Sequence, residues 1–136
     1  MKHSVLVLAD DLFWRTKIDH AAKSGQAVAV FIGKPSELPA AADPSKVGVV
    51  IVDLALRDEP FAAIAALKKN PKTKSIPVIG YYEHVRKDLE KKGKEAGCDV
   101  LLTRSAFSQK MGDLVLKYAL PGSIRQEQAE EELPEE

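Results

Sequence analysis

Cysteine is nearly absent from this chain, which has one, Cys98, among 136 residues. A lone cysteine cannot form an internal disulfide or supply the paired thiolates of a structural zinc site. We expect Cys98 to be a small core residue instead. The three histidines, His3, His20 and His84, are not spaced as metal ligands, so surface or helix positions are expected for them.

Long hydrophobic runs are also absent, since no apolar segment approaches the roughly 20 residues that span a bilayer. The first residues, MKHSVLVLADD, reach two acids too early for a secretory signal. We therefore expect a cytoplasmic protein without membrane attachment. The hydrophobic residues make up 45% of the chain and are spread along it, as in one globular domain.

Neither sign of charge is in excess, because 20 basic residues stand against 20 acidic ones. Residues 123–136 hold one arginine and six glutamates, which leaves 19 basic against 14 acidic residues before them. This small positive excess does not indicate a nucleic-acid-binding protein. We expect a folded domain over residues 1–122, ended by Pro121 and Gly122, and an acidic, disordered tail over residues 123–136.

Apolar segments alternate with segments of helical periodicity five times along the chain. The expected strands are 4–9, 27–32, 46–53, 77–82 and 100–103. The segment 34–46 holds three prolines, so any helix there is short. With right-handed crossovers, this pattern predicts an α/β, three-layer doubly wound sandwich around a parallel sheet. The flavodoxin-like order 2-1-3-4-5 would place the ends of the first and third strands side by side.

Helical spacing also predicts which side chains face the core. On the first helix these are Phe13, Ile18, Ala21 and Ala22, and on the fourth they are Val85, Leu89 and Ala96. Trp14 is expected to be partly buried near the carboxyl ends of the strands.

The stretch KVGVVIVDLALR, residues 46–57, is an apolar, β-branched run interrupted by one carboxylate, Asp53. Such a run is typical of a strand covered on both faces. Ligands of open parallel sheets bind beyond the carboxyl ends of the strands, where Asp53 would lie. A turn or helix-capping role for Asp53 remains the alternative.

Two further acids, Asp10 and Asp11, follow the first strand and would converge with Asp53 in the order 2-1-3-4-5. Three carboxylates at one crevice repel unless a cation or protons relieve them, and oxygen ligands suit magnesium. The alternative is that each acid caps a separate helix.

Several ligand-binding motifs are missing from the chain. There is no GxGxxG, no glycine-rich P-loop and no nucleophile elbow. The loop ADDLFWRTK places two negative charges where a flavin phosphate would have to bind.

Over residues 4–119 the sequence resembles the receiver domains of two-component response regulators. The similarity lies in the order and spacing of LVLADD, VVIVDLAL, LKKNPKTKSIPVIG and EAGCDVLL. By this resemblance Asp53 corresponds to the phosphorylated aspartate, and Asp10 and Asp11 correspond to the acids that bind magnesium with it.

The departures from the family lie at the residues that serve phosphorylation. The threonine or serine that the family has at the end of strand four is replaced by Tyr82, and the small residue that follows it is replaced by Glu83. Arg104 and Leu101 stand where the family has its lysine and its aromatic switch residue. The bulky ring of Tyr82 would hinder the entry of a phosphoryl group. The negative charge of Glu83 would repel that group, whose own charge is near −2.

The resemblance and its departures predict a non-enzymatic, receiver-like signalling module, a pseudo-receiver with a degenerate phosphorylation switch. Its partner would be another signalling protein, a histidine kinase or an effector. One alternative is a phosphoaccepting receiver of a His-Asp phosphorelay that uses Asp53 and magnesium. Another is a flavodoxin-like domain that binds a small ligand.

The expected fourth helix carries Lys87, Lys91 and Lys94 at spacings of three and four, which places them on one outward stripe. This stripe could bind an acidic partner, and the acidic residues 123–136 could compete for it. The alternative is a merely solvated face.

Overall fold

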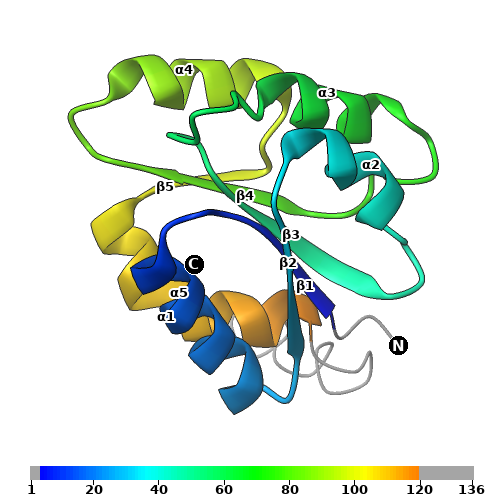
Figure 1. Cartoon of the computed structure of the whole chain (residues 1–136), viewed down its shortest axis with the longest axis vertical. Coiled ribbons are helices and arrows are strands. Elements are labelled where there is room, and N and C mark those ends of the chain that lie inside the picture. The colour runs from blue at the N-terminus through cyan, green and yellow to red at the C-terminus, as the bar shows by residue number, and fades with distance from the viewer. Residues whose placement is uncertain (1–3, 120–136) are drawn as a thin grey trace, which may run out of the picture.

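A computed structural model describes residues 4–119, which form one parallel sheet with helices on both faces (Figure 1). The strands are β1 (Ser4–Leu8), β2 (Val28–Ile32), β3 (Val47–Asp53), β4 (Val78–Tyr82) and β5 (Val100–Thr103). Their order is β2-β1-β3-β4-β5, and every neighbouring pair is parallel. The three-layer α/β sandwich and the strand order predicted from the sequence are therefore confirmed.

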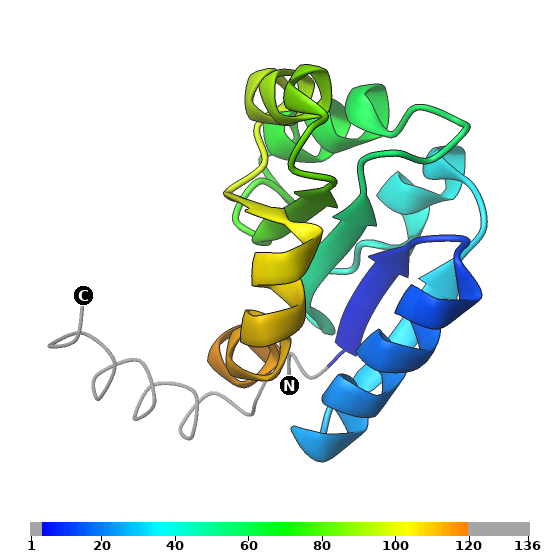
Figure 2. The ribbon, with the colours of Figure 1, turned by 90° about the vertical axis from the view of Figure 1, so that its left-hand side faces the viewer.

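The connecting segments are helical. They are α1 (Leu12–Ser24), a 3-10 turn η1 (Pro35–Glu37), α2 (Leu38–Ala41), α3 (Phe61–Lys69), α4 (Lys87–Ala96) and α5 (Arg104–Ala119). Helices α1 and α5 cover one face of the sheet, and α2, α3 and α4 cover the other (Figures 1 and 2). The carboxyl ends of all five strands meet at one edge of the sandwich, as in any parallel sheet.

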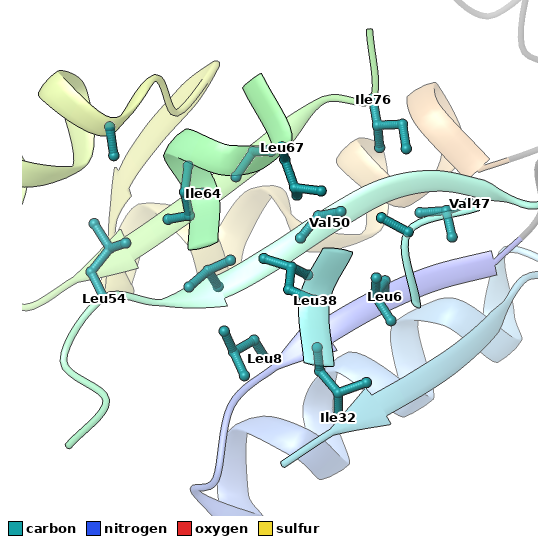
Figure 3. Packing of buried hydrophobic residues seen from close by; sticks show 14 of the residues in the cluster. Leu6, Leu8, Ile32, Leu38, Val47, Val50, Leu54, Ile64, Leu67 and Ile76 are labelled. Atoms are coloured by element: carbon teal, nitrogen blue, oxygen red, sulfur yellow. The ribbon is translucent and has the colours of Figure 1, made fainter. Parts of the chain in front are cut away.

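Strand β3 lies in the centre of the sheet, and all seven of its residues are buried. Its alternate side chains enter the two cores, so valines and isoleucines suit both of its faces. The α2, α3 and α4 core contains Leu6, Val50, Leu54, Ile64 and Leu67, several of which Figure 3 draws in contact. Each fully buried side chain of this kind contributes about 1.5–3 kcal/mol.

The helix ends follow the expected chemistry. The Asp11 carboxylate accepts a hydrogen bond from the Trp14 N–H at 3.2 Å, so Asp11 is the N-cap of α1, and Gly25 is its C-cap. Gly97 ends α4 with φ of 104°, a conformation that favours glycine. The Cys98 thiol next to it packs against the core, where burial raises its pKa to about 11.

Two side chains predicted to face the core are exposed instead. Phe13 is 62% exposed, because the neighbouring Trp14 takes the buried position in the first turn of α1. Val85 is 67% exposed, because α4 begins only at Lys87 and Val85 belongs to the loop before it. Trp14 is 7% exposed and is more deeply buried than expected.

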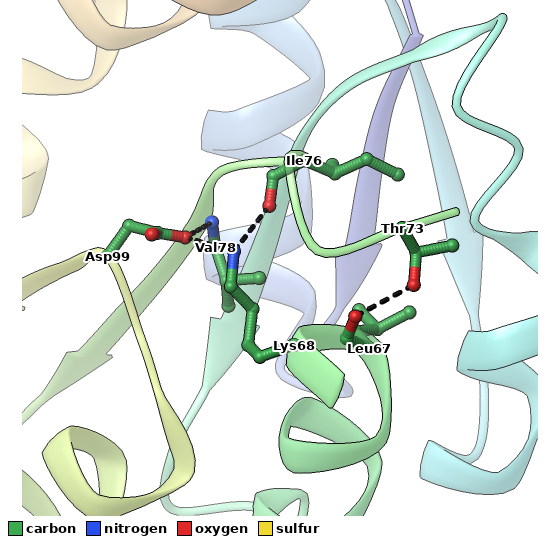
Figure 4. A network of polar contacts seen from close by, with 6 residues as sticks. All are labelled: Leu67, Lys68, Thr73, Ile76, Val78 and Asp99. Atoms are coloured by element: carbon green, nitrogen blue, oxygen red, sulfur yellow. Dashed lines mark hydrogen bonds and ion pairs between the residues drawn. The ribbon is translucent and has the colours of Figure 1, made fainter. Parts of the chain in front are cut away.

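A polar network holds the end of the sheet opposite the candidate site (Figure 4). Lys68 Nζ donates to Asp99 Oδ2 at 2.7 Å and to the Ile76 carbonyl at 3.0 Å. Asp99 Oδ2 also accepts from the Val78 N–H at 2.8 Å. The network joins the end of α3 to the amino ends of β4 and β5.

None of the helices within residues 4–119 has the length and hydropathy needed to cross a bilayer. The expected boundary at Pro121 and Gly122 and the tail over 123–136 lie outside the described residues.

Candidate functional site

Asp53 is the last residue of β3 and is 4% exposed. Its Oδ1 accepts a hydrogen bond from the Ala55 N–H at 2.9 Å, which fixes the first turn after the strand. The N-cap residue of α3 is Pro60, so Asp53 does not cap that helix. The carboxylate is thus held at the carboxyl edge of the sheet, where a ligand of this fold class would bind.

Arg104, the first residue of α5, bridges two carboxylates at this edge. Its Nη2 lies 3.9 Å from Asp53 Oδ2, and its Nη1 donates to Glu83 Oε1 at 3.2 Å. An ion pair therefore lies beside the acid that the sequence singled out at the end of the third strand. The Arg104 Nε is buried without a hydrogen-bond partner among residues 4–119, so the guanidinium is only partly satisfied.

The electrostatic environment of Asp53 opposes its negative charge. Burial is the main cause and raises the pKa of Asp53 above its ordinary value of 3.8. The hydrogen bond from Ala55 and the charge of Arg104 lower this pKa, while the charges of Asp10 and Asp11 raise it further. The charges of Asp10 and Asp11 therefore lie close enough to act on Asp53.

The arrangement of Asp10 and Asp11 does not complete a metal site. Asp11 caps α1, and Asp10 is exposed. Within residues 4–119, no three histidine, cysteine, aspartate or glutamate side chains are grouped closely enough to hold a metal ion. Because Arg104 supplies the cation beside Asp53, the residues as placed here do not fit magnesium through three carboxylates.

Tyr82 and Glu83, at the end of β4, point into different surroundings. Tyr82 is 3% exposed and belongs to the core beneath α4 with Leu89. Its pKa is raised by burial and by a hydrogen bond to Glu90. The Glu83 side chain is 55% exposed and directs its carboxylate to Arg104. Of the two, Glu83 is the residue that contacts Arg104 beside Asp53.

Tyr81 is a neighbour of Asp53 that the sequence interpretation missed. It is fully buried, and its backbone pairs in register with that of Asp53 on the neighbouring strand. Its ring stacks on Phe107 at 4.7 Å between centroids and contacts Trp14 at 5.2 Å. Burial and the Asp53 charge raise its pKa, and its hydroxyl has no hydrogen-bond partner within the described part of the chain.

The signal that could have identified Tyr81 is the alternation of side chains along a strand. Residues paired directly across two strands point to the same face, so Tyr81 rather than Tyr82 lies beside Asp53. Without the register of β3 and β4, the sequence does not show which of the two adjacent tyrosines lies beside Asp53.

A second candidate surface lies between α4 and β5. It is a hollow of about 560 Å³ lined by Lys87, Glu90, Lys91, Lys94, Cys98, Asp99 and Leu101. The three lysines predicted to share an outward stripe are all exposed, and Leu101 is partly buried against the core. Lys87 Nζ lies 3.7 Å from Glu90 Oε1, so the positive charge of the hollow is partly balanced.

No protein-family model matches the chain, and none of the curated proteins matches it. Solved structures do match. A chemotaxis response regulator of Vibrio cholerae superposes with a TM-score of 0.71 at 16% identity, covering 86% of this chain and 98% of its own.

Two further matches come from proteins of other organisms. The receiver domain of a sensor histidine kinase from Pseudomonas aeruginosa, with magnesium coordinated in its active-site cleft, has a TM-score of 0.74 at 12% identity, covering 88% of this chain and 98% of its own. A phosphorylated cyanobacterial phytochrome response regulator has a TM-score of 0.68 at 18% identity, covering 85% and 89%. At such identities the shared property is the fold, so the chain has the fold of receiver domains.

Proposed function

We propose that this chain is a receiver-like, non-enzymatic signalling module that acts through protein–protein contacts and has a degenerate phosphorylation switch. The receiver fold supports the general class. The single observation that carries the finer proposal is the position of Arg104, whose guanidinium contacts Asp53 at 3.9 Å and Glu83 at 3.2 Å. Asp53 is therefore already paired with a cation, which Glu83 also contacts.

Glu83 opposes phosphorylation of Asp53 by charge. A phosphoryl group carries close to two negative charges near neutral pH and would need the cation that Glu83 already contacts. Asp53 is itself 4% exposed, which limits the approach of a phosphodonor. Receiver domains have a small hydroxyl residue at the position of Tyr82. Here the Tyr82 ring packs in the core beneath α4 instead.

Magnesium belongs to the alternative function, a phosphoaccepting receiver. In such a protein Asp10, Asp11 and Asp53 would hold the ion, which would neutralise charge on the incoming phosphoryl group. Here Asp11 instead accepts the Trp14 N–H, and Arg104 lies beside Asp53. Weak magnesium binding would require these contacts to rearrange.

The surface that supports partner binding is the hollow between α4 and β5. Lys87, Lys91 and Lys94 line it together with the apolar Leu101, a combination that suits an acidic segment carrying an apolar side chain. The partner we propose is therefore another signalling protein with an acidic contact surface, either a histidine kinase or an effector.

The test is incubation of the full chain with magnesium and acetyl phosphate, followed by measurement of the intact mass. We expect the parent protein to stay at its unmodified mass. The double variant Tyr82→Thr, Glu83→Ala frees Arg104 and restores a small hydroxyl residue, so we expect it to gain one phosphoryl group. The same double variant carrying Asp53→Asn is the control and should remain unmodified.

Rapid, stoichiometric modification of the parent protein, lost on Asp53→Asn, would overturn the degenerate switch. The phosphoaccepting receiver would then be the better description. The receiver fold and the α4 surface would not be affected by that result.

A further inference from the structure

Strand β2 forms one edge of the sheet, and no described strand pairs with its outer side. Its sequence, VAVFI, contains no charge and no proline. Sheet edges usually carry such residues, because an open row of backbone N–H and C=O groups can pair with another chain. The outer edge of β2 lacks this protection over its whole length.

The face of β2 next to α2 is also uncovered. Val28 and Val30 are 51% and 42% exposed, whereas Ile32, on the same face, is buried. The reason is that α2 is a single turn in a segment with three prolines. Its Leu38 belongs to the same buried cluster as Ile32, and that cluster does not include Val28 or Val30. Two large apolar side chains thus lie beside an open backbone edge.

The open edge has a defined length. Immediately after β2, the N–H groups of Gly33 and Lys34 both donate to Glu37 Oε1, at 3.1 Å and 2.9 Å. The chain therefore satisfies these two N–H groups itself, and the edge that no described strand pairs is restricted to Val28–Ile32.

We propose that β2 is a self-association edge, which pairs antiparallel with β2 of a second copy about a two-fold axis at Val30. The two sheets would then continue into one another. With a two-fold axis, each copy contributes the same five residues to the contact. Neither copy then has a free β2 edge for a third copy, so the assembly stops at a dimer.

The pairing is complementary in size and charge. Centred on Val30, it places Val28 opposite Ile32 and the small Ala29 opposite the larger Phe31. The nearest charged residue on the carboxyl side, Lys34, would lie opposite Gln26, so no like charges meet. The exposed valines of both copies would form one apolar strip on the α2 face.

A second copy suits this edge better than a different protein would. An uncharged strand offers no charge for a charged partner to recognise. A second β2, in contrast, matches the first in side-chain size along the whole edge. A single strand pair buries less than the 1,200–2,000 Å² or so of a standard interface. The dimer should therefore be weak and depend on protein concentration.

The test is sedimentation equilibrium of the full chain over roughly a hundredfold range of concentration. We expect the average mass to rise from 14.9 kDa toward twice that value. Val30→Lys and Val30→Glu should each remain monomeric, because like charges would face one another on the axis. An equimolar mixture of the two variants should dimerise, since opposite charges then meet.

The matched control is Val85→Lys, which places the same charge at another exposed valine and should leave the dimer unchanged. Circular dichroism checks that each variant is folded. A parent protein that stays at 14.9 kDa at every concentration overturns the proposal. So does a mixture that stays monomeric, a Val85→Lys variant that dissociates equally, or an open-ended series of larger species.

Discussion

Two carboxylate–cation pairs lie at opposite ends of the same sheet, and they differ in how fully they are satisfied. Asp99 and Lys68 are 2.7 Å apart, and each also makes a hydrogen bond to the backbone. Asp53 and Arg104 are 3.9 Å apart, and Arg104 also contacts Glu83. The first pair joins three segments of the fold, whereas the second leaves the buried Arg104 Nε without a partner among the described residues.

The difference indicates what each pair contributes. An ion pair with short, complete hydrogen bonds stabilises the structure around it, whereas a loose pair around a buried carboxylate costs desolvation without full compensation. Folding alone gives no reason to keep Asp53 charged at its buried position.

The largest effect is expected from breaking the complete pair. Lys68→Met keeps the aliphatic stem but removes the donor to Asp99 and to the Ile76 carbonyl. Because the Asp99 side chain is 43% exposed, the loss should be at the lower end for charged hydrogen bonds, about 1.5–2 kcal/mol of unfolding free energy. Urea denaturation measures it.

The control for this variant is Lys69→Met at the exposed neighbouring position, which should leave the urea midpoint nearly unchanged. An equal loss in both variants would show that lysine charge near the end of α3, rather than the network, is responsible.

A smaller effect, opposite in sign at the two sites, is expected from the same substitution. Asp99→Asn should destabilise the fold by about 1 kcal/mol, because the charge-assisted bond to Lys68 is lost. Asp53→Asn should stabilise it at neutral pH, by about 1 kcal/mol, because a buried charge is removed while Arg104 keeps Glu83. Thermal and urea unfolding of both variants give the comparison.

The pH dependence of the unfolding free energy tests whether the buried charge of Asp53 causes this difference. Since burial raises the pKa of Asp53 above 3.8, the folded state binds the proton more tightly than the unfolded state does. The parent protein should therefore lose stability as the pH rises from 3.8 through the folded-state pKa of Asp53. The stability advantage of Asp53→Asn over the parent should disappear as the pH falls below 3.8. An advantage independent of pH would contradict this explanation.

The smallest effect is expected for a fully solvated pair. Lys23 and Asp19 are 3.0 Å apart on α1, with side chains 73% and 37% exposed. Lys23→Gln should change the unfolding free energy by less than about 0.5 kcal/mol, and added salt should remove even that difference. A loss as large as that of Lys68→Met would mean that distance alone, without burial, decides the contribution of a pair.

The sheet could be predicted from the sequence because each strand carries its own signal. A valine-rich run such as that of β3 needs cover on both faces, and helical segments between such runs force parallel strands. Details that depend on where a helix begins could not be predicted. Val85 matches the helical spacing of Leu89, yet α4 starts after it at Lys87.

The strand order predicted from the sequence places Asp53 and Arg104 at the same edge of the sheet, since Asp53 ends β3 and Arg104 follows β5. It did not reveal how Arg104 divides its contacts, because the bond to Glu83 depends on the path of the loop after β4. Tyr81 was missed for a related reason. Only the register of β3 and β4 shows which of two adjacent tyrosines lies beside Asp53.

The stack of Trp14, Tyr81 and Phe107 gives the surroundings of Asp53 an intrinsic optical reporter. Trp14 is the chain's single tryptophan, and its ring contacts Tyr81, the residue paired with Asp53. Because close-packed rings transmit small displacements to one another, a change of charge at Asp53 should alter the surroundings of the indole. Fluorescence emission of the unlabelled protein should therefore follow events at a carboxylate that absorbs no visible or near-ultraviolet light.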